Sequence, residues 1–228
     1  MKEQLNLKEF SKLTLYYTSA LKQLETELNI INQEFEVLSD NNPINHIKTR
    51  IKTIASIVEK LKRKDMDISV ENMFELGDVV GARVVCNFID DIYVVLDRIK
   101  QNKMLNIIEE KDYIKNPKVS GYRGYHIILS MPIVINGDRK DIKVEIQLRT
   151  TAMDFWASSE HRLNYKAEGI SLEDQEELKN AAEEVWHIDL SMNDLAKKQR
   201  NSLKTESNDM RLKIIDSFMN RRANDEVC

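Results

Sequence analysis

A short basic and aromatic segment, residues 111–126 (KDYIKNPKVSGYRGYH), holds the side chains best suited to binding a phosphorylated ligand. Gly121 and Gly124 flank Tyr122 and Arg123, so the backbone can adopt positive φ or approach a ligand closely. A tyrosine ring offers a platform for a flat base, and arginine and lysine suit phosphate oxygens. The segment indicates a loop that binds a nucleotide polyphosphate. The alternative is a solvated Gly/Pro/Lys turn between two strands, because such turn chemistry is common.

A second polar pattern lies in residues 141–149 (DIKVEIQLR), where apolar and polar side chains alternate. Period-two alternation predicts a strand with its apolar side chains in the core and its polar ones on the opposite face. That polar face carries an acid, an amide and a base in succession: Glu145, Gln147 and Arg149. This is the set that a metal-phosphate site needs, although a solvated outer face is the default for an antiparallel strand.

The charge distribution favours a small anionic ligand over a long one. The 228 residues carry a formal net charge of −4, which gives no global argument for nucleic-acid binding. Residues 48–64 nevertheless concentrate basic side chains around the single acid Glu59, whereas residues 168–184 are strongly acidic. A basic local field within an acidic protein suits a compact polyanion such as a nucleotide.

The remaining composition indicates a cytoplasmic protein with no membrane partner. Cys86 and Cys228 form no disulfide framework, which fits a reducing compartment, and no Cys or His pairs have zinc-ligand spacing. The N-terminus lacks the apolar run of a signal peptide, and the longest apolar run, residues 125–135, is too short to span a bilayer.

Hydrophobic periodicity predicts helices at the start of the chain. From Leu7 to Leu38 apolar residues recur at steps of three and four, which predicts a long amphipathic helix. We favour packing against its own domain over a dimer-forming seam. After a break at residues 40–43, a second helix is expected from Ile44. Its core stripe would be Ile47, Ile51, Ile54, Val58 and Leu61.

The middle of the chain predicts a sheet. A short helix and turn are expected over residues 65–76, and a buried strand over residues 77–88, entered through Gly77 and Asp78. A helix is then expected over residues 90–100. Further strands are expected over residues 104–114, 125–135 and 141–149, the last two joined by a hairpin turn at Asn136-Gly137-Asp138.

The C-terminal third predicts helices. Thr150 or Thr151 can cap a helix over residues 151–166, and another is expected from Ser171 to about Ala196. Residues 197–209 suit either a linker or a solvated helix. Beyond them, a docking helix is expected, with one apolar face formed by Met210, Ile214 and Phe218. The predicted organisation is an N-terminal helix (1–40), a catalytic core (41–170) and C-terminal helices for oligomerisation or docking (171–228).

Four motifs, in this order and spacing, carry a family resemblance: KTRIKTIASIVEKLKRK, GDVVGARVVCNFIDDIY, KDYIKNPKVSGYRGYH and VEIQLRTTAMDFWASSEHRLNYK. Together they resemble the synthetase domain of the RelA/SpoT homologues, and more narrowly the stand-alone small alarmone synthetases. The resemblance covers roughly residues 42–166. It implies an α+β fold: a mixed, mostly antiparallel sheet flanked by helices, related to nucleotidyltransferases, with long N- and C-terminal helices.

The resemblance also implies an activity and its participants. These proteins are ATP:GTP/GDP 3′-pyrophosphotransferases, which use Mg²⁺ to make the alarmones (p)ppGpp of the stringent response and release AMP. By resemblance, Asp78 and Glu145 would hold Mg²⁺, with Glu145 as the candidate base. The ATP-binding residues would be Arg50, Ser56, Lys60 and Arg83. The GTP/GDP-binding residues would be Lys111, Lys118, Tyr122, Arg123, His126 and Gln147.

Several details place the chain within the family. The start of the MDFWAS helix is similar to the RelP/YwaC branch rather than to RelQ, in which basic residues of the first helix help bind an activating alarmone. The matching positions here are Glu25, Asn29 and Asn32. The loop reads GYRGYH, so Gly124 replaces the serine that is more common in the family. None of the four histidines is followed by aspartate, so the His-Asp hydrolase of longer members is not expected.

Two other hypotheses remain beside the synthetase. The first is a non-catalytic nucleotide- or RNA-binding regulatory module on the same fold, with tight binding and no turnover. The second, which can coexist with catalysis, is an assembly protein driven by its end helices. By resemblance the partners are ATP and GTP or GDP, with GMP as a further acceptor. A homotetramer and single-stranded RNA as a regulator are also implied.

Overall fold

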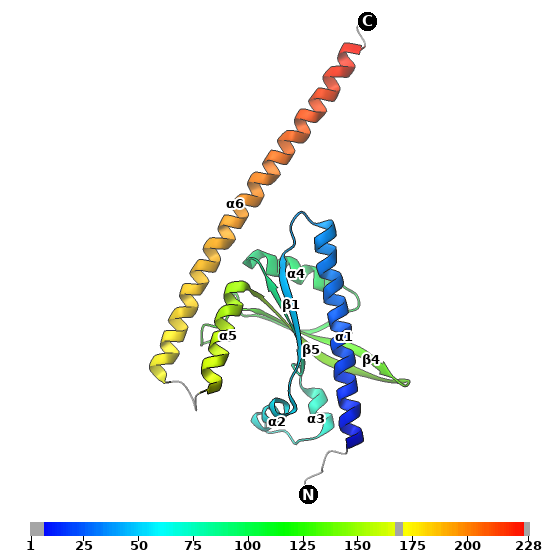
Figure 1. Ribbon diagram of the computed structural model, residues 1–228, viewed down its shortest axis with the longest axis vertical. Coiled ribbons are helices and arrows are strands. Elements are labelled where there is room, and N and C mark those ends of the chain that lie inside the picture. Colours follow the sequence, from blue (N-terminus) through cyan, green and yellow to red (C-terminus); the bar gives the residue numbers. More distant parts are fainter. Residues whose placement is uncertain (1–6, 167–170, 226–228) are drawn as a thin grey trace.

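The computed structural model describes the backbone of residues 7–166 and 171–225, and the side chains of residues 8–163 and 171–203. Figure 1 shows a sheet with helices around it and one long helix that continues beyond it. In chain order the elements are α1 (Leu7–Leu38), β1 (Ile44–Ile51), α2 (Ile54–Arg63), α3 (Val70–Glu75), β2 (Val80–Cys86), α4 (Ile89–Gln101), β3 (Asn106–Asp112), β4 (Tyr125–Ile135), β5 (Asp138–Thr150), α5 (Thr151–Lys166) and α6 (Leu172–Asp225).

The strands form one mixed sheet in the order β1-β2-β5-β4-β3. β2 and β5 run parallel, and the other neighbouring pairs are antiparallel. β5 is the last strand along the chain, yet it lies at the centre of the sheet. The structure therefore confirms the predicted α+β class and the mostly antiparallel sheet. The turn at Asn136 and Gly137 has positive φ at both residues, as the predicted hairpin requires.

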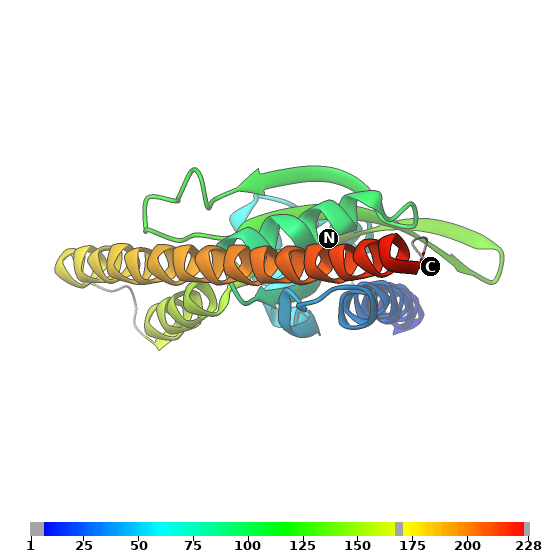
Figure 2. The same cartoon turned by 90° about the horizontal axis from the view of Figure 1, so that it is seen from above.

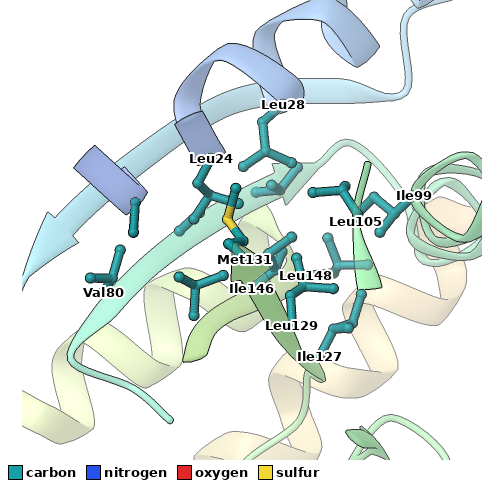
Figure 3. Close-up of a cluster of buried hydrophobic side chains, with 14 of the residues drawn as sticks. Leu24, Leu28, Val80, Ile99, Leu105, Ile127, Leu129, Met131, Ile146 and Leu148 are labelled. Carbon is teal, nitrogen blue, oxygen red and sulfur yellow. The ribbon is translucent and has the colours of Figure 1, made fainter. Parts of the chain in front are cut away.

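The main core lies on one face of this sheet, beneath α1 and α4. Leu24 and Leu28 from α1 meet Ile99 from α4 and the inward side chains of β4 and β5, as Figure 3 shows. The alternation predicted for β5 is present, with its apolar side chains fully buried in this core. The prediction that α1 packs against its own domain is confirmed. Its buried residues are Leu13, Tyr16, Tyr17, Ala20, Leu24, Leu28 and Ile31.

The helix predicted from Ile44 is wrong, because residues 44–51 form β1, the edge strand that pairs with β2. Ile47 and Ile51 are four residues apart, a spacing that suits both one face of a helix and one face of a strand. The chain becomes helical only at Ile54, where the side chain of Thr53 accepts a hydrogen bond from the Ser56 backbone N–H. Pairing with β2, which is distant in sequence, selects the strand.

A single helix, α6, extends from Leu172 to Asp225, so residues 197–209 are helical rather than a linker. It lies beside α5, passes α4 and then leaves the sheet behind (Figures 1 and 2). The side chains of the predicted docking face, Met210, Ile214 and Phe218, lie outside those described. Within the described residues, no helix is both long and apolar enough to cross a membrane.

Candidate active site

A row of polar side chains crosses the sheet on the face opposite the core. In register order the row contains Lys48 of β1, Arg83 of β2, Gln147 of β5, His126 of β4 and Lys111 of β3. Residues paired across a sheet point to the same face, so one ladder brings together side chains from all five strands. Four of these five residues were predicted site residues, and they came from three separate motifs.

The adjacent row carries Arg50, Gly81 and Glu145 on the same face. Gly81 lies between the other two and has no side chain. A cavity of about 260 Å³ opens there, lined in part by all three residues and Asp78. The absence of a side chain at residue 81 leaves space beside the Glu145 carboxylate.

Two larger cavities lie over this face. The first has a volume of about 1110 Å³ and the second about 570 Å³. They share Arg50, Lys118, His126, Gln147 and His161 in their walls. Ligand cavities in proteins are typically about 300–1,000 Å³, so the combined space suits two nucleotides. Basic side chains outnumber acidic ones in both walls, which explains how a protein of net charge −4 can attract a polyanion.

Asp78, just before β2, lies in the wall of the larger cavity between two lysines. Its Oδ2 atom is 2.5 Å from Nζ of Lys52 and 2.5 Å from Nζ of Lys60. Burial acts to raise the pKa of this carboxyl, but the two ammonium groups prevail and the pKa is lowered. Its Oδ1 atom is buried without a hydrogen-bond partner. Asp78 is therefore ionised at neutral pH and keeps one acceptor oxygen for a further cation.

Glu145, in the middle of β5, is held by two neighbours on the same face. Oε1 lies 3.1 Å from Nδ1 of His126, and Oε2 accepts a hydrogen bond from Nε2 of Gln147 at 2.7 Å. Burial acts to raise the pKa of Glu145, but these hydrogen bonds outweigh it, and the pKa lies below its ordinary value. The carboxylate is thus charged and fixed in position while it faces the cavity.

The two predicted metal ligands, Asp78 and Glu145, line the same cavity, and the charge of Asp78 acts to raise the pKa of Glu145. No cluster of three or more His, Cys, Asp or Glu residues within the described part of the chain could hold a metal by itself. Mg²⁺ is typically bound by one or two carboxylates together with substrate phosphates. Two ionised carboxylates, one with an orphaned oxygen, therefore fit Mg²⁺ when a phosphorylated ligand is present.

Tyr122 lies at the back of the smaller cavity and is almost fully buried, with its ring edge-on to His126. Its hydroxyl is 2.5 Å from Nε2 of His126 and accepts a hydrogen bond from Nε of Arg149. Nζ of Lys118 lies 4.7 Å from the centres of both the Tyr122 and Tyr113 rings. An ammonium group, rather than a base, rests on these aromatic faces in this structure.

The other predicted residues divide between the two cavities, with one exception. Ser56, Lys60 and Lys111 line the larger cavity, Arg83 lines the smaller, and Arg50 lines both. The exception is Arg123, which is absent from both walls. The structure thus brings together every predicted site residue except Arg123.

Three charged residues had no predicted binding role: Lys52, in the wall of the larger cavity, and Arg149 and Asp154, which pair beside the smaller one. Oδ1 of Asp154 lies 3.0 Å from Nη1 of Arg83 and 3.0 Å from Nη1 of Arg149. Nη2 of Arg149 also donates to Oε1 of Gln147 at 2.7 Å. Arg149 belongs to the alternating polar set of β5, which was the available signal. Asp154 in the first turn of α5 gave none beyond helix formation, and Lys52 was one of many basic residues.

Known proteins share the sequence motifs and the fold of this chain. Residues 49–170 match the family described as "Region found in RelA / SpoT proteins". GTP pyrophosphokinase YwaC of Bacillus subtilis is 42% identical to this chain, and the match covers 82% of this chain and 90% of the length of YwaC. A B. subtilis small alarmone synthetase 1 structure, bound to its product pppGpp, has a TM-score of 0.78 at 34% identity, covering 84% of this chain and 98% of that one. The small alarmone synthetase 2 structure from the same organism has a TM-score of 0.74 at 41% identity, covering 82% and 97%.

Proposed function

The chain belongs to the RelA/SpoT family, as a small alarmone synthetase similar to YwaC, and we propose that it transfers diphosphate from ATP to a guanine nucleotide. The acceptor is GTP or GDP, and GMP is a further candidate. The products are the alarmones (p)ppGpp and AMP. The His-Asp pair expected of the family's hydrolase does not occur in this sequence, and the activity proposed here is that of the synthetase.

One observation carries the proposal: two ionised carboxylates, Asp78 and Glu145, face a basic cavity large enough for two nucleotides. Phosphoryl-type transfer requires in-line positioning of donor and acceptor and neutralisation of charged oxygens. A module that only binds a nucleotide needs the basic walls but not the paired carboxylates. The catalytic alternative is therefore preferred to the non-catalytic one.

The reaction can be written with its bonds balanced. The 3′ oxygen of the acceptor ribose forms a bond to the β-phosphorus of ATP, and the bond from that phosphorus to the oxygen bridging the α-phosphate breaks. AMP leaves with that oxygen. Glu145 accepts the proton of the 3′ hydroxyl, a role supported by its ionised state and by the hydrogen bonds from His126 and Gln147 that fix it.

Asp78 and Glu145 would hold Mg²⁺ together with phosphate oxygens. The ion would supply charge neutralisation on the diphosphate as it moves. Lys52 and Lys60 both donate to Oδ2 of Asp78 in the wall of the larger cavity, which supports a place for their ammonium groups beside the phosphate oxygens. Ser56 lies one turn before Lys60 on α2 and lines the same cavity, which supports a place near the ATP phosphates.

We assign the base-binding roles to two places in the cavities. Arg50 and Arg83 come from neighbouring strands on one face and are proposed to sandwich the adenine, because planar guanidinium groups stack on flat rings. Tyr122 is proposed to stack on guanine once Lys118 leaves its ring. Lys111, Lys118, His126 and Gln147 would then line the acceptor side.

The test is nucleotide chromatography after incubation of the protein with ATP, GDP and Mg²⁺. AMP and a 3′-diphosphorylated guanine nucleotide should form in equal amounts, and their absence would reject the proposal. Glu145→Gln should abolish turnover while the thermal unfolding temperature stays close to that of the wild type. Glu75→Gln is the control, because Glu75 is exposed, pairs with Lys143 and lies outside the cavities.

Assembly and location complete the proposal. We propose a homo-oligomer, a tetramer by resemblance to the family, supported by exposed apolar side chains along α6: Ile188, Met192, Leu195 and Leu203. Size-exclusion chromatography with light scattering on Ile188→Asp and Leu195→Asp variants tests it, and an unchanged mass would reject this face. A cytoplasmic location is proposed because ATP and GTP are found there. Single-stranded RNA remains a proposed regulator, supported only by the basic cavity.

A further inference from the structure

The loop that carries Tyr122, residues 113–124, has two anchors: Ile114 is buried in the main core, and Tyr122 packs in a cluster outside it. It joins β3 to β4 beyond their last paired residues, Asp112 and Tyr125, and is closed by a hydrogen bond from the Tyr113 N–H to the Gly124 carbonyl. Tyr122 belongs to a second, smaller apolar cluster with Trp156 and Ala157 of α5 and Ala182 of α6. The position of Tyr122 within the loop therefore depends on these two helices.

The loop backbone rests directly on α6. Gly121 has a φ of +85°, and a Cβ atom at this position would lie only 2.6 Å from Cβ of Ala182. On the other side of the cluster, Nε1 of Trp156 donates a hydrogen bond to the Leu178 carbonyl of α6 at 3.0 Å. The stretch of α6 from Leu178 to Trp186 thus contacts both α5 and the loop.

Arg123 also links the loop to α6. Its guanidinium carbon lies 4.2 Å from the centre of the Trp186 ring, and Nη2 lies 3.3 Å from Glu183. Nη1 donates to the Ile114 carbonyl within the loop at 3.0 Å. The side chain is 12% exposed and lies beside Val185 and Trp186, outside both nucleotide-sized cavities. The side chain of Arg123 therefore packs against α6 and does not line either cavity.

We propose that Arg123 is a positioning residue, which clamps the loop onto Trp186 of α6 and thereby holds Tyr122 ready for the acceptor nucleotide. The inference rests on the proposed function, since it concerns the acceptor side of that site. A nucleotide that binds to an already ordered loop loses less binding free energy to the ordering of that loop. The clamp should therefore increase the affinity for the acceptor nucleotide. In the proposed function, ATP binds to other elements, β1, β2 and α2, so its affinity should not depend on the clamp.

Separate measurements of kcat and of KM for GDP and for ATP test the inference. Trp186→Leu removes the ring on α6 without altering any residue of the cavities. It should raise KM for GDP by about 2- to 30-fold, the range for a cation–π contact between exposed and desolvated sites. KM for ATP should stay at the wild-type value. Glu184→Gln, a change at an exposed position on the same turn of α6, should alter neither KM.

Two conservative variants separate positioning from charge. Arg123→Lys keeps the positive charge but loses the planar fork, so it should raise KM for GDP as Trp186→Leu does. Trp186→Phe keeps an aromatic face and should restore most of the affinity. If Trp186→Leu does not fold, the contrast between Arg123→Lys and Trp186→Phe gives the same test.

The results that would overturn the inference are distinct. Unchanged KM for GDP in Trp186→Leu, with a raised KM in Arg123→Ala, would mean that the guanidinium contacts the acceptor directly. A fall in kcat alone, or an equal rise in both KM values, would mean a general structural role. A wild-type protein that forms no AMP would instead reject the proposed function and leave the clamp to be measured by GDP binding at equilibrium.

Discussion

Nδ1 of His126 lies 3.1 Å from Oε1 of Glu145, and the two side chains come from adjacent antiparallel strands. The other carboxylate oxygen is held by Gln147, so each oxygen has its own neighbour. Burial, the largest single influence, raises the pKa of Glu145, and these hydrogen bonds more than reverse it. His126 and Gln147 therefore keep Glu145, the proposed base, ionised although its burial favours the protonated form.

Removing His126 should shift the acid limb of the pH–rate profile. In the wild type, kcat should fall only below pH 4.5, the ordinary pKa from which that of Glu145 is lowered. In His126→Ala the effect of burial remains and a lowering partner is lost, so the pKa rises and the limb moves to higher pH. Ionised Glu145 stabilises the folded protein at pH values above its unfolded-state pKa, and this contribution is lost as the pH falls. Raising the folded-state pKa in His126→Ala therefore also lowers the free energy of unfolding. Profiles of kcat over pH 4–8 check this.

The control for this experiment is His187→Ala, which removes an exposed histidine of α6. Its profile should match that of the wild type. An acid limb that stays in place in His126→Ala would show that His126 does not govern the ionisation of Glu145.

Asp78→Asn should weaken the dependence on Mg²⁺ that the proposed function requires. The amide keeps the shape of the side chain but loses the charge that neutralises the metal, so kcat should fall by about 10²–10³, as for other single charge-stabilising groups. The Mg²⁺ concentration at half-maximal rate should rise, and a chelator should stop the wild-type reaction. Asp65→Asn is the control, because Asp65 has a φ of 55°, which asparagine also tolerates. Wild-type Mg²⁺ dependence in Asp78→Asn would contradict the assignment.

Asp154→Asn should destabilise the protein and disturb the site together. One carboxylate oxygen lies between two guanidinium groups, those of Arg83 and Arg149, and loss of the negative charge leaves two cations beside each other without their counter-ion. The free energy of unfolding should fall by about 2–4 kcal/mol, measured by urea denaturation, because a largely buried charge network is broken. The exposed pair of Asp141 with Arg139 offers the comparison, and Asp141→Asn should change stability by less than about 0.5 kcal/mol. Equal effects would contradict this account.

Arg200→Ala should loosen α6 in a pH-dependent way. Asp91 is 2% exposed, and burial raises its pKa despite the hydrogen bond from Arg200. Without Arg200 the pKa rises further, so the loss of stability, about 1–3 kcal/mol at pH 7, should shrink as the pH falls and Asp91 takes up a proton. Thermal unfolding at pH 7 and pH 5 measures this. Lys197→Ala breaks the more exposed pair with Asp90 and should have little effect at either pH.

Much of the fold could be predicted from local sequence patterns, because burial of one face of a strand or helix determines which of its positions are apolar. The alternation in residues 141–149 gave the two faces of β5, and the three–four spacing gave α1 with its bounds. The strand at residues 44–51 was missed because the spacing of Ile47 and Ile51 satisfies both periods. Only the partner strand decides between them, and β2 lies more than 25 residues later.

Sequence motifs predicted which residues belong to the candidate site. They did not predict the contacts between elements that are distant in sequence. Arg149 and Asp154 are five residues apart in sequence, but Arg83 joins them only because β2 runs parallel to β5. Likewise, the glycines beside Arg123 indicate a loop without revealing that α6 lies against it. Family resemblance placed Arg123 with the acceptor, whereas its partners in this structure are Trp186 and Glu183.

The order of the strands has a consequence for the growing chain. β5 is the last of the strands to be synthesised, but it fills the gap between β2 and β4. A polypeptide that ends before Asp138 therefore has two separate strand pairs and no Glu145. Joining them requires contacts between residues about sixty positions apart, which slows folding relative to local pairing. An incomplete nascent chain therefore cannot begin to make a signalling nucleotide; synthesis must reach beyond the middle strand before the enzyme exists.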